Sequence, residues 1–294
     1  MITGEAFPGY LPYPNIASEV QRLLGSGGDS PRIIVSVREP LYRAYSSYKY
    51  NYLRMGLKNL REKDKNPQTD EYYKENFLLS FEELINAELE YLKECLEPGG
   101  KAEVLTFEKY GQRVMNFSNS STPSNILVDV ELCYAKTSSG NETSSPHEGY
   151  HLSKLMEIYP EKVTDIPQTN HLIRSMLARG IYILSIDWWY ETFDKSDIHV
   201  VCLEELSQSQ IAMDNVTRFL GLPTYDFSSI ITKERYNVGG NEGFTSLTRT
   251  EGTSTATKSA SIPLSDKLRY EVQGFFSFYN ERLFERMGRR CSWG

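Results

Sequence analysis

The chain has 294 residues, and its 39% hydrophobic content, with 20 Tyr and 13 Phe, supplies a sizeable core and excludes wholesale disorder. Its net charge of −7 argues against a general nucleic-acid binder, which is usually basic, so any anion-binding cleft must be local. No run of about 18 apolar residues predicts a transmembrane helix. The first ten residues also lack the basic and apolar regions of a signal peptide.

The N-terminal stretch 2–11, ITGEAFPGYL, has the character of a strand end that runs into a loop. Glu5 lies in this loop, next to Gly4 and Ala6. A single glutamate in a loop is usually a solvated surface residue, and the functional alternative is a general base held beside a sheet. The following residues, 15–24, predict a helix with one apolar face.

A strand followed by a helix is predicted at 32–50, RIIVSVREPLYRAYSSYKY. The apolar, β-branched run predicts a buried parallel strand, and Pro40 stops it and opens a helix over 41–50. Arg38 therefore falls at the carboxyl end of the strand, and Ser46 falls in the early turns of the helix. Ligands of open α/β sheets bind at this edge, where a helix N-terminus and an arginine favour phosphate or sulfate. The alternative is an arginine paired with a surface carboxylate and a serine with no ligand.

The middle of the chain predicts one long helix between two polar segments. Residues 56–76 are rich in charged side chains and predict an exposed loop. Residues 78–96 predict an amphipathic helix, opened by a capping box that begins at Ser80. Residues 112–149 are rich in Ser, Thr and Asn and predict a long loop. We interpret residues 1–294 as a single domain with loop insertions near 56–76 and 112–149.

The C-terminal half predicts helices around a second strand. Residues 171–193 predict two helices that meet at Gly180, and an apolar run at 198–203 predicts a strand. A helix follows at 208–220 and ends at a glycine, which is typical of a helix terminus. The last helix is predicted over 265–287.

The chain has four cysteines, Cys95, Cys133, Cys202 and Cys291. Their spacing fits neither a zinc site nor a redox C-x-x-C motif. Cys202 lies in an apolar run and is predicted to be a buried free thiol, whereas the other three can be free or paired. No metal site is predicted, because His147 and His151 have no third ligand nearby. Four N-x-S/T sequons, three of them in one polar stretch, are consistent with the lumen of the secretory pathway.

The pattern R-x-P-x-x-R-x-x-S behind a hydrophobic strand resembles the 3′-phosphate-binding segment of sulfotransferases that use 3′-phosphoadenosine-5′-phosphosulfate (PAPS). The resemblance implies that Arg38 and Ser46 hold the 3′-phosphate of this donor. In Golgi carbohydrate sulfotransferases of the heparan and chondroitin type, a G/F-E-x-x-x-x-Y stretch precedes this segment. Glu5 matches its glutamate, which deprotonates the acceptor. In the heparan-type relatives, an aromatic residue lies on the adenine and a lysine lies in a loop that covers the phosphates. Phe244 and Lys258 match these two positions.

Later segments keep the order of the same family, with Gly180, Tyr182 and Trp188 followed by a strand and by the F-L-G of residues 219–221. The family's first strand and its Gly/Thr/Lys phosphosulfate loop have no counterpart here, and residues 1–10 leave no room for them. The expected fold is therefore α/β, a P-loop-like parallel sheet flanked by helices, with the first strand and loop missing. We interpret the chain as an N-terminally incomplete sulfotransferase domain.

The resemblance implies transfer of a sulfuryl group from PAPS, the co-substrate, to a carbohydrate hydroxyl or amine, with no metal. It implies a glycan or proteoglycan acceptor, no nucleic acid, and contact with a membrane only through a segment not in this chain. The implied location is the Golgi lumen, as a type II membrane protein. The alternative is a non-catalytic sulfotransferase-like module that binds a nucleotide or glycan. A small-molecule kinase is disfavoured, because neither a Walker lysine nor an acidic pair for Mg²⁺ is evident.

Overall fold

The computed structural model describes nine parts of the chain, and every structural statement below concerns these parts: residues 4–6, 10–11, 14–25, 30–96, 155, 157–163, 176–206, 209–231 and 262–293. The earlier predictions that fall outside them include the loop over 112–149, the histidines His147 and His151, the aromatic residue Phe244 and the lysine Lys258. The predicted strands and the predicted anion site lie inside them.

Two parallel strands pair in the described part of the chain, β1 (Ile33–Val37) and β2 (Ile198–Cys202). Ile33 lies opposite Ile198, and Val37 lies opposite Cys202. Because the strands are parallel and in this register, both carboxyl ends reach the same edge of the sheet. Parallel strands need a long crossover between them, and helices supply it here. The predicted α/β class therefore agrees with a helix-rich chain around a small parallel sheet.

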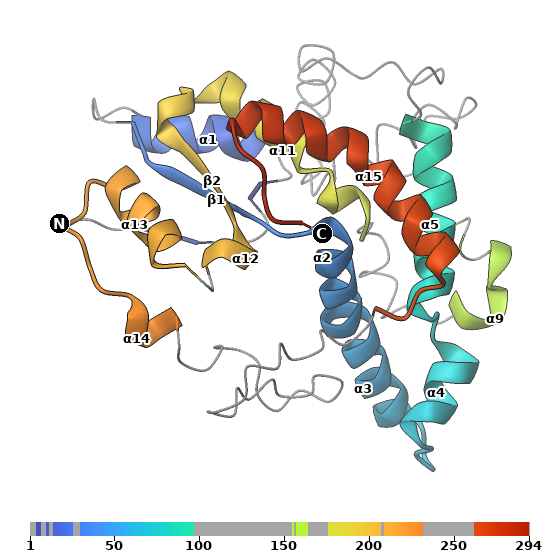
Figure 1. Ribbon diagram of the computed structural model, residues 1–294. Helices are drawn as coiled ribbons and strands as arrows, with labels where there is room; N and C mark the ends of the chain where they lie inside the picture. Colours follow the sequence, from blue (N-terminus) through green and yellow to red (C-terminus); the bar gives the residue numbers. More distant parts are fainter. Residues whose placement is uncertain are drawn as a thin grey trace.

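Helices make up most of the described chain (Figure 1). They are α1 (Pro14–Leu24), α2 (Pro40–Ser47), the π-helix η2 (Tyr48–Leu53), α3 (Arg54–Lys63), α4 (Asp70–Phe77), α5 (Phe81–Leu96), α9 (Pro160–Val163), the 3₁₀ turn η4 (Ala178–Gly180), α11 (Tyr182–Thr192), the 3₁₀ turn η5 (Lys195–Asp197), α12 (Leu203–Leu206), α13 (Gln210–Phe219), α14 (Ser228–Ile231) and α15 (Asp266–Met287).

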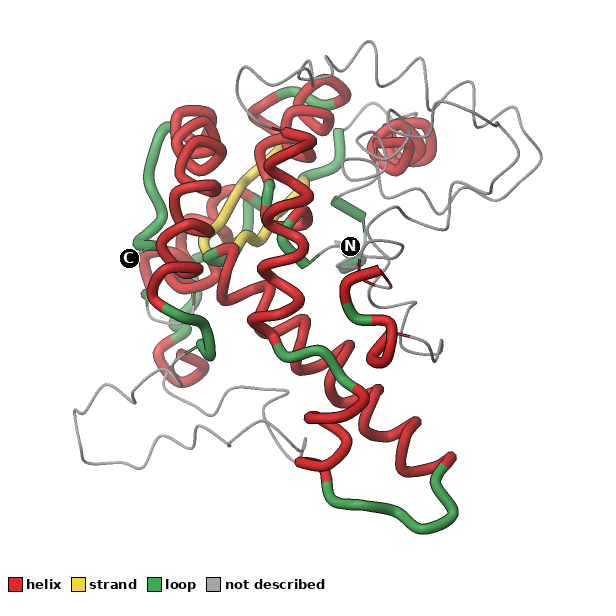
Figure 2. Tube along the Cα trace, turned by 90° about the vertical axis from the view of Figure 1, so that its right-hand side faces the viewer, coloured by secondary structure: helices red, strands yellow, loops and turns green. Residues whose placement is uncertain are grey.

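The exposed loop predicted over 56–76 is wrong, because α3 and α4 occupy most of it as a helical hairpin that extends away from the strands (Figure 2). The Tyr73 side chain is 2% exposed, and its hydroxyl donates to Asp64 Oδ2 at 2.8 Å. Arg61 on α3 pairs with Asp70 at the start of α4. The charged side chains that suggested a loop instead cover the outer faces of two helices and join them.

The capping box predicted at Ser80 is confirmed. The Ser80 backbone N–H donates to Glu83 Oε2 at 2.7 Å, and the Glu83 N–H donates to Ser80 Oγ at 3.2 Å. Each side chain therefore satisfies a backbone group that the first turn of α5 leaves unpaired. The helix begins at Phe81, three residues after the predicted start.

Gly221 ends α13 as predicted, with a φ of 68°. The Leu222 N–H donates to the Thr217 carbonyl at 2.9 Å, and the Gly221 N–H donates to the Arg218 carbonyl at 3.0 Å. This pair of bonds is the Schellman arrangement, which needs a left-handed residue at the position of Gly221.

Gly221→Ala should lower the free energy of unfolding by about 1 kcal/mol, because an L-residue is strained at positive φ. No atom lies within 4 Å of a Cβ added at Gly221, so the backbone alone carries this cost. Gly274→Ala is the matched control, because Gly274 lies within α15 and also has open space around it. That variant should gain about 0.5–1 kcal/mol. Urea titrations of both variants measure the difference, and equal shifts would contradict the assigned conformations.

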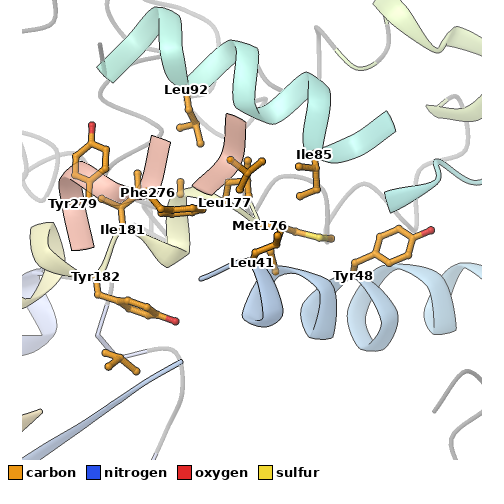
Figure 3. Close-up of a cluster of buried hydrophobic side chains, with 14 of the residues drawn as sticks. Leu41, Tyr48, Ile85, Leu92, Met176, Leu177, Ile181, Tyr182, Phe276 and Tyr279 are labelled. Atoms are coloured by element: carbon orange, nitrogen blue, oxygen red, sulfur yellow. The ribbon is translucent and has the colours of Figure 1, made fainter. Parts of the chain in front are cut away.

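The core lies where α2, α5, α11 and α15 meet (Figure 3). Aliphatic and aromatic side chains from these helices, from η2 and from residues 176–181 interlock there, including Leu41, Tyr48, Ile85, Leu92, Met176, Leu177, Ile181, Tyr182, Phe276 and Tyr279. Of the tyrosines on α2 and η2, Tyr48 and Tyr52 are buried, whereas Tyr42 and Tyr50 are exposed. This core holds the strand–helix turn that carries Arg38.

The free thiol predicted at Cys202 is wrong, because Cys202 forms a disulfide with Cys291. Its predicted burial is right, since Cys202 is 0% exposed and Cys291 is 6% exposed. An apolar neighbourhood in sequence indicates burial, but the pairing depends on where the chain after α15 returns. It returns to the end of β2, 89 residues away in sequence.

Candidate functional site

The turn from β1 to α2 consists of Arg38 and Glu39, at the carboxyl edge of the sheet. The Glu39 side chain accepts a hydrogen bond from the Tyr42 N–H at 2.6 Å and so caps α2. Burial raises the pKa of Glu39. The free N–H groups expected to receive an anion are therefore partly taken by a carboxylate of the chain itself. An anion at this turn must rely mainly on side chains.

The Tyr182 hydroxyl holds the Arg38 backbone in place. It donates to the Arg38 carbonyl at 2.9 Å, and it accepts from the Arg38 N–H at 3.3 Å. Burial raises the pKa of Tyr182 to about 12, so the hydroxyl keeps its proton at neutral pH. Tyr182 opens α11, which lies far from Arg38 in sequence. The conformation of the turn is thus set by a tertiary contact.

Cationic side chains gather around this turn. Arg38 and Ser46 are both half-buried, on the turn and on α2 respectively. Burial lowers the pKa of Lys49, and the charge of Arg38 lowers it further. The pKa of Arg43 is lowered in the same way, by burial and then by Arg38. The charge of Arg38 thus disfavours the protonated forms of Lys49 and Arg43, a repulsion that an anion bound at Arg38 would relieve.

The residues at this turn fit a phosphate group. The Nε atom of Arg43 is buried and has no hydrogen-bond partner among the residues that the structure describes. A buried guanidinium N–H without a partner is costly, and a nearby anion reduces the cost of burying the charge. Arg38, with Ser46 on the following helix, supplies a planar donor fork and a hydroxyl, the groups that phosphate oxygens accept.

Glu5, the predicted general base, lies on a separate N-terminal segment and is exposed. Its Oε1 accepts a hydrogen bond from the Tyr10 hydroxyl, and this bond raises the pKa of Tyr10. The segment is tied to α11, because Trp189 Nε1 donates to the Leu11 carbonyl at 3.1 Å. The structure thus places Arg38 on the β1–α2 turn, Ser46 near the C-terminal end of α2, and Glu5 on a separate segment that is joined to α11.

Glu204 and Trp293 complete this edge of the sheet, and the sequence reading assigned neither to it. Glu204 Oε1 accepts from the Glu39 N–H at 3.0 Å, and Glu204 Oε2 accepts from Trp293 Nε1 at 3.1 Å. The Trp293 ring lies 6.3 Å from that of Tyr182, so the C-terminal segment reaches the start of α2 (Figure 1). The E-x-L after β2 and the closing tryptophan were visible in the sequence, but their contact was not.

Two further properties concern metals and membranes. In the described ranges, no group of three or more His, Cys, Asp and Glu side chains is placed to hold a metal ion. Across the same ranges, none of the helices combines the length and the apolar character needed to cross a bilayer.

No family model matches the chain. A curated relative, the "Membrane-associated sulfotransferase kil1" of Dictyostelium discoideum, is 22% identical over 304 residues, which cover 99% of this chain and 53% of the relative. The chain therefore spans about half the length of this relative. Among solved structures, a sulfotransferase from Alicyclobacillus acidocaldarius matches with a TM-score of 0.36 and 16% identity, over 96% of this chain and 63% of that one. That structural likeness is too slight to support the fold. By sequence, the chain is similar to a sulfotransferase at low identity.

Proposed function

We propose that the protein transfers a sulfuryl group from PAPS to a hydroxyl or amine of a carbohydrate. The observation that carries the proposal is the cationic turn at Arg38, which joins a parallel strand to the helix bearing Ser46. It occurs in a chain related to a sulfotransferase along 99% of its length. A turn of this kind suits the phosphate of a nucleotide donor, because ligands of parallel sheets bind at the carboxyl ends of the strands.

In this proposal Arg38 and Ser46 bind the 3′-phosphate of the donor. Arg38 supplies two parallel N–H donors, and the Ser46 hydroxyl supplies a third. The family motif assigns the adenine to Phe244 and the donor phosphates to Lys258. The chain's net charge of −7 makes this local set of cations the feature that attracts an anionic donor.

Glu5 acts as the general base of the proposed reaction. It accepts the proton of the acceptor hydroxyl, and the acceptor oxygen then attacks the sulfur atom in line. A new S–O bond forms to the acceptor while the S–O bond to the 5′-phosphate breaks. The electron pair of the broken bond leaves with 3′-phosphoadenosine-5′-phosphate. Tyr10, which donates to Glu5, orients the carboxylate for this step.

The Golgi lumen is the proposed location, with a glycan or proteoglycan as acceptor. The buried disulfide between Cys202 and Cys291 supports an oxidising compartment, where such bonds form and persist. The proposed type II topology requires a membrane segment outside this chain. The relative from Dictyostelium discoideum is described as membrane-associated.

Arg38→Ala should weaken binding of 3′-phosphoadenosine-5′-phosphate about 10–100-fold, because hydrogen bonds to charged groups contribute about 1.5–3 kcal/mol. Calorimetry of the purified chain measures this. Arg54→Ala is the matched control, because the Arg54 guanidinium lies over the Tyr50 ring on the neighbouring helical turns. Equal affinities in wild type and Arg38→Ala would overturn the donor site. Binding without transfer of labelled sulfate from PAPS to glycosaminoglycans would favour the non-catalytic alternative.

A further inference from the structure

Glu88 is a buried carboxylate that the proposed reaction does not use. It lies on α5 and is 1% exposed. Its Oε1 accepts from the Met176 N–H at 3.0 Å, and its Oε2 accepts from the Leu177 N–H at 2.8 Å. A buried carboxylate is costly unless hydrogen bonds offset its lost hydration. Here both oxygens bind the backbone of one short turn, so the carboxylate fixes that turn against α5.

Arg43 holds the same turn from the opposite side. Its Nη2 donates to the Met176 carbonyl. Burial lowers the pKa of Arg43, while the charge of Glu88 favours its protonated form. Met176 and Leu177 therefore lie between α5 and α2 (Figure 3), and charged side chains from both helices bind their backbone.

The chain that follows Met176 and Leu177 contacts the strand–helix turn that carries Arg38. Gly180, in this following segment, lies so close to α2 that a Cβ added there would approach the Pro40 Cβ to 2.9 Å. Two residues later, the Tyr182 hydroxyl binds both the N–H and the carbonyl of Arg38. The position of this segment therefore determines where Pro40 and the Arg38 backbone sit.

We infer that Glu88 and Arg43 are positioning residues of the donor site, an inference that rests on the proposed function. They hold Met176 and Leu177 between α5 and α2. The segment that follows, through Tyr182, then positions the Arg38 backbone so that the Arg38 side chain can bind the 3′-phosphate. Neither side chain needs to touch the nucleotide. Geometry at a bidentate arginine site is strict, so a small displacement of the Arg38 backbone costs affinity.

Glu88→Gln tests this inference, because it keeps the shape of the side chain but turns an NH₂ group toward a backbone N–H. The probes are 3′-phosphoadenosine-5′-phosphate and adenosine 5′-monophosphate, which differ only in the 3′-phosphate. We expect the ratio of their affinities to fall about tenfold, equivalent to 1.4 kcal/mol. Loss of folded protein alone would lower both affinities equally and leave the ratio unchanged.

Glu83→Gln is the matched control on the same helix. Glu83 caps α5 and pairs with Lys162, so its loss affects stability without reaching Met176 or Leu177. This variant should keep the wild-type ratio. If Glu88→Gln does not fold, Tyr182→Phe removes only the hydroxyl that joins the turn to Arg38, and its ratio should fall in the same way.

A wild-type ratio in Glu88→Gln, or in Tyr182→Phe where the first variant does not fold, overturns the positioning role. A wild-type protein that binds both nucleotides equally overturns the proposed donor site instead. The two failures are therefore distinguishable, because the first concerns the variants and the second concerns the wild type.

Discussion

Glu5→Gln should slow sulfuryl transfer by about 10²–10⁴-fold, the usual contribution of a general base. Glutamine has nearly the shape of glutamate, and its Oε1 can still accept the hydrogen bond from Tyr10. The amide cannot take up the proton of the acceptor hydroxyl. The variant should therefore bind 3′-phosphoadenosine-5′-phosphate as the wild type does, since Arg38 lies on a different element. Single-turnover transfer of labelled sulfate from PAPS to a glycosaminoglycan measures the rate.

Tyr10→Phe is the companion variant for this prediction. It keeps the ring and removes the hydroxyl that orients the Glu5 carboxylate. Its rate should fall less than that of Glu5→Gln, because the proton acceptor itself remains. A Glu5→Gln enzyme with the wild-type rate would exclude Glu5 as the base, and the base would then have to come from another element.

Loss of the disulfide should lower the free energy of unfolding by about 2–5 kcal/mol. The bond joins residues 89 apart in sequence, so it removes much of the conformational freedom of the unfolded chain. It also ties the C-terminal segment to the end of β2. The paired variant Cys202→Ala/Cys291→Ala, compared with wild type by urea unfolding, measures the cost.

Reductant provides the control. Wild type should lose stability when a thiol reagent is added, toward the value of the paired variant. Any change that reductant still causes in that variant belongs to Cys95 and Cys133. Peptide mapping without reduction should recover one fragment that contains both Cys202 and Cys291. Recovery of both cysteines as alkylated thiols would contradict the bond.

Loss of the disulfide should also affect the C-terminal segment where it contacts the carboxyl edge of the sheet, beside Arg38. Trp293 binds Glu204, which also accepts the Glu39 N–H beside Arg38. Reduction releases the covalent tie next to this contact. The disulfide therefore links the stability of the chain to the geometry of the proposed donor site.

Local chemistry made several elements predictable from the sequence. An apolar β-branched run ended by Pro40 determined β1 and the start of α2, because proline cannot continue a strand ladder and its φ suits the first turn of a helix. The capping box at Ser80 and the glycine at 221 marked helix ends, because each satisfies unpaired backbone groups within a few residues. These interactions are short in sequence, so a local pattern records them.

The charged stretch over 56–76 shows where local patterns mislead. The density of charged residues there correctly indicated exposure. The outer faces of α3 and α4, however, are exposed in the same way as a loop. The contacts that hold the two helices together, such as the hydrogen bond from Tyr73 to Asp64, join residues nine positions apart. They form only when the helical hairpin closes. Hydrophilic composition alone does not distinguish a solvated helix from a loop.

By itself, the sequence determined that Arg38 stands at the strand–helix turn and that Ser46 lies on the helix that follows, since both positions follow from one continuous segment. Only the tertiary structure decided what holds that turn. Glu88, Tyr182 and the Cys202–Cys291 disulfide come from distant parts of the chain and meet it through packing. Contacts of this kind depend on how α5, α11 and the C-terminal segment assemble around the sheet. No local pattern encodes that assembly, because its energy comes from burying many side chains together.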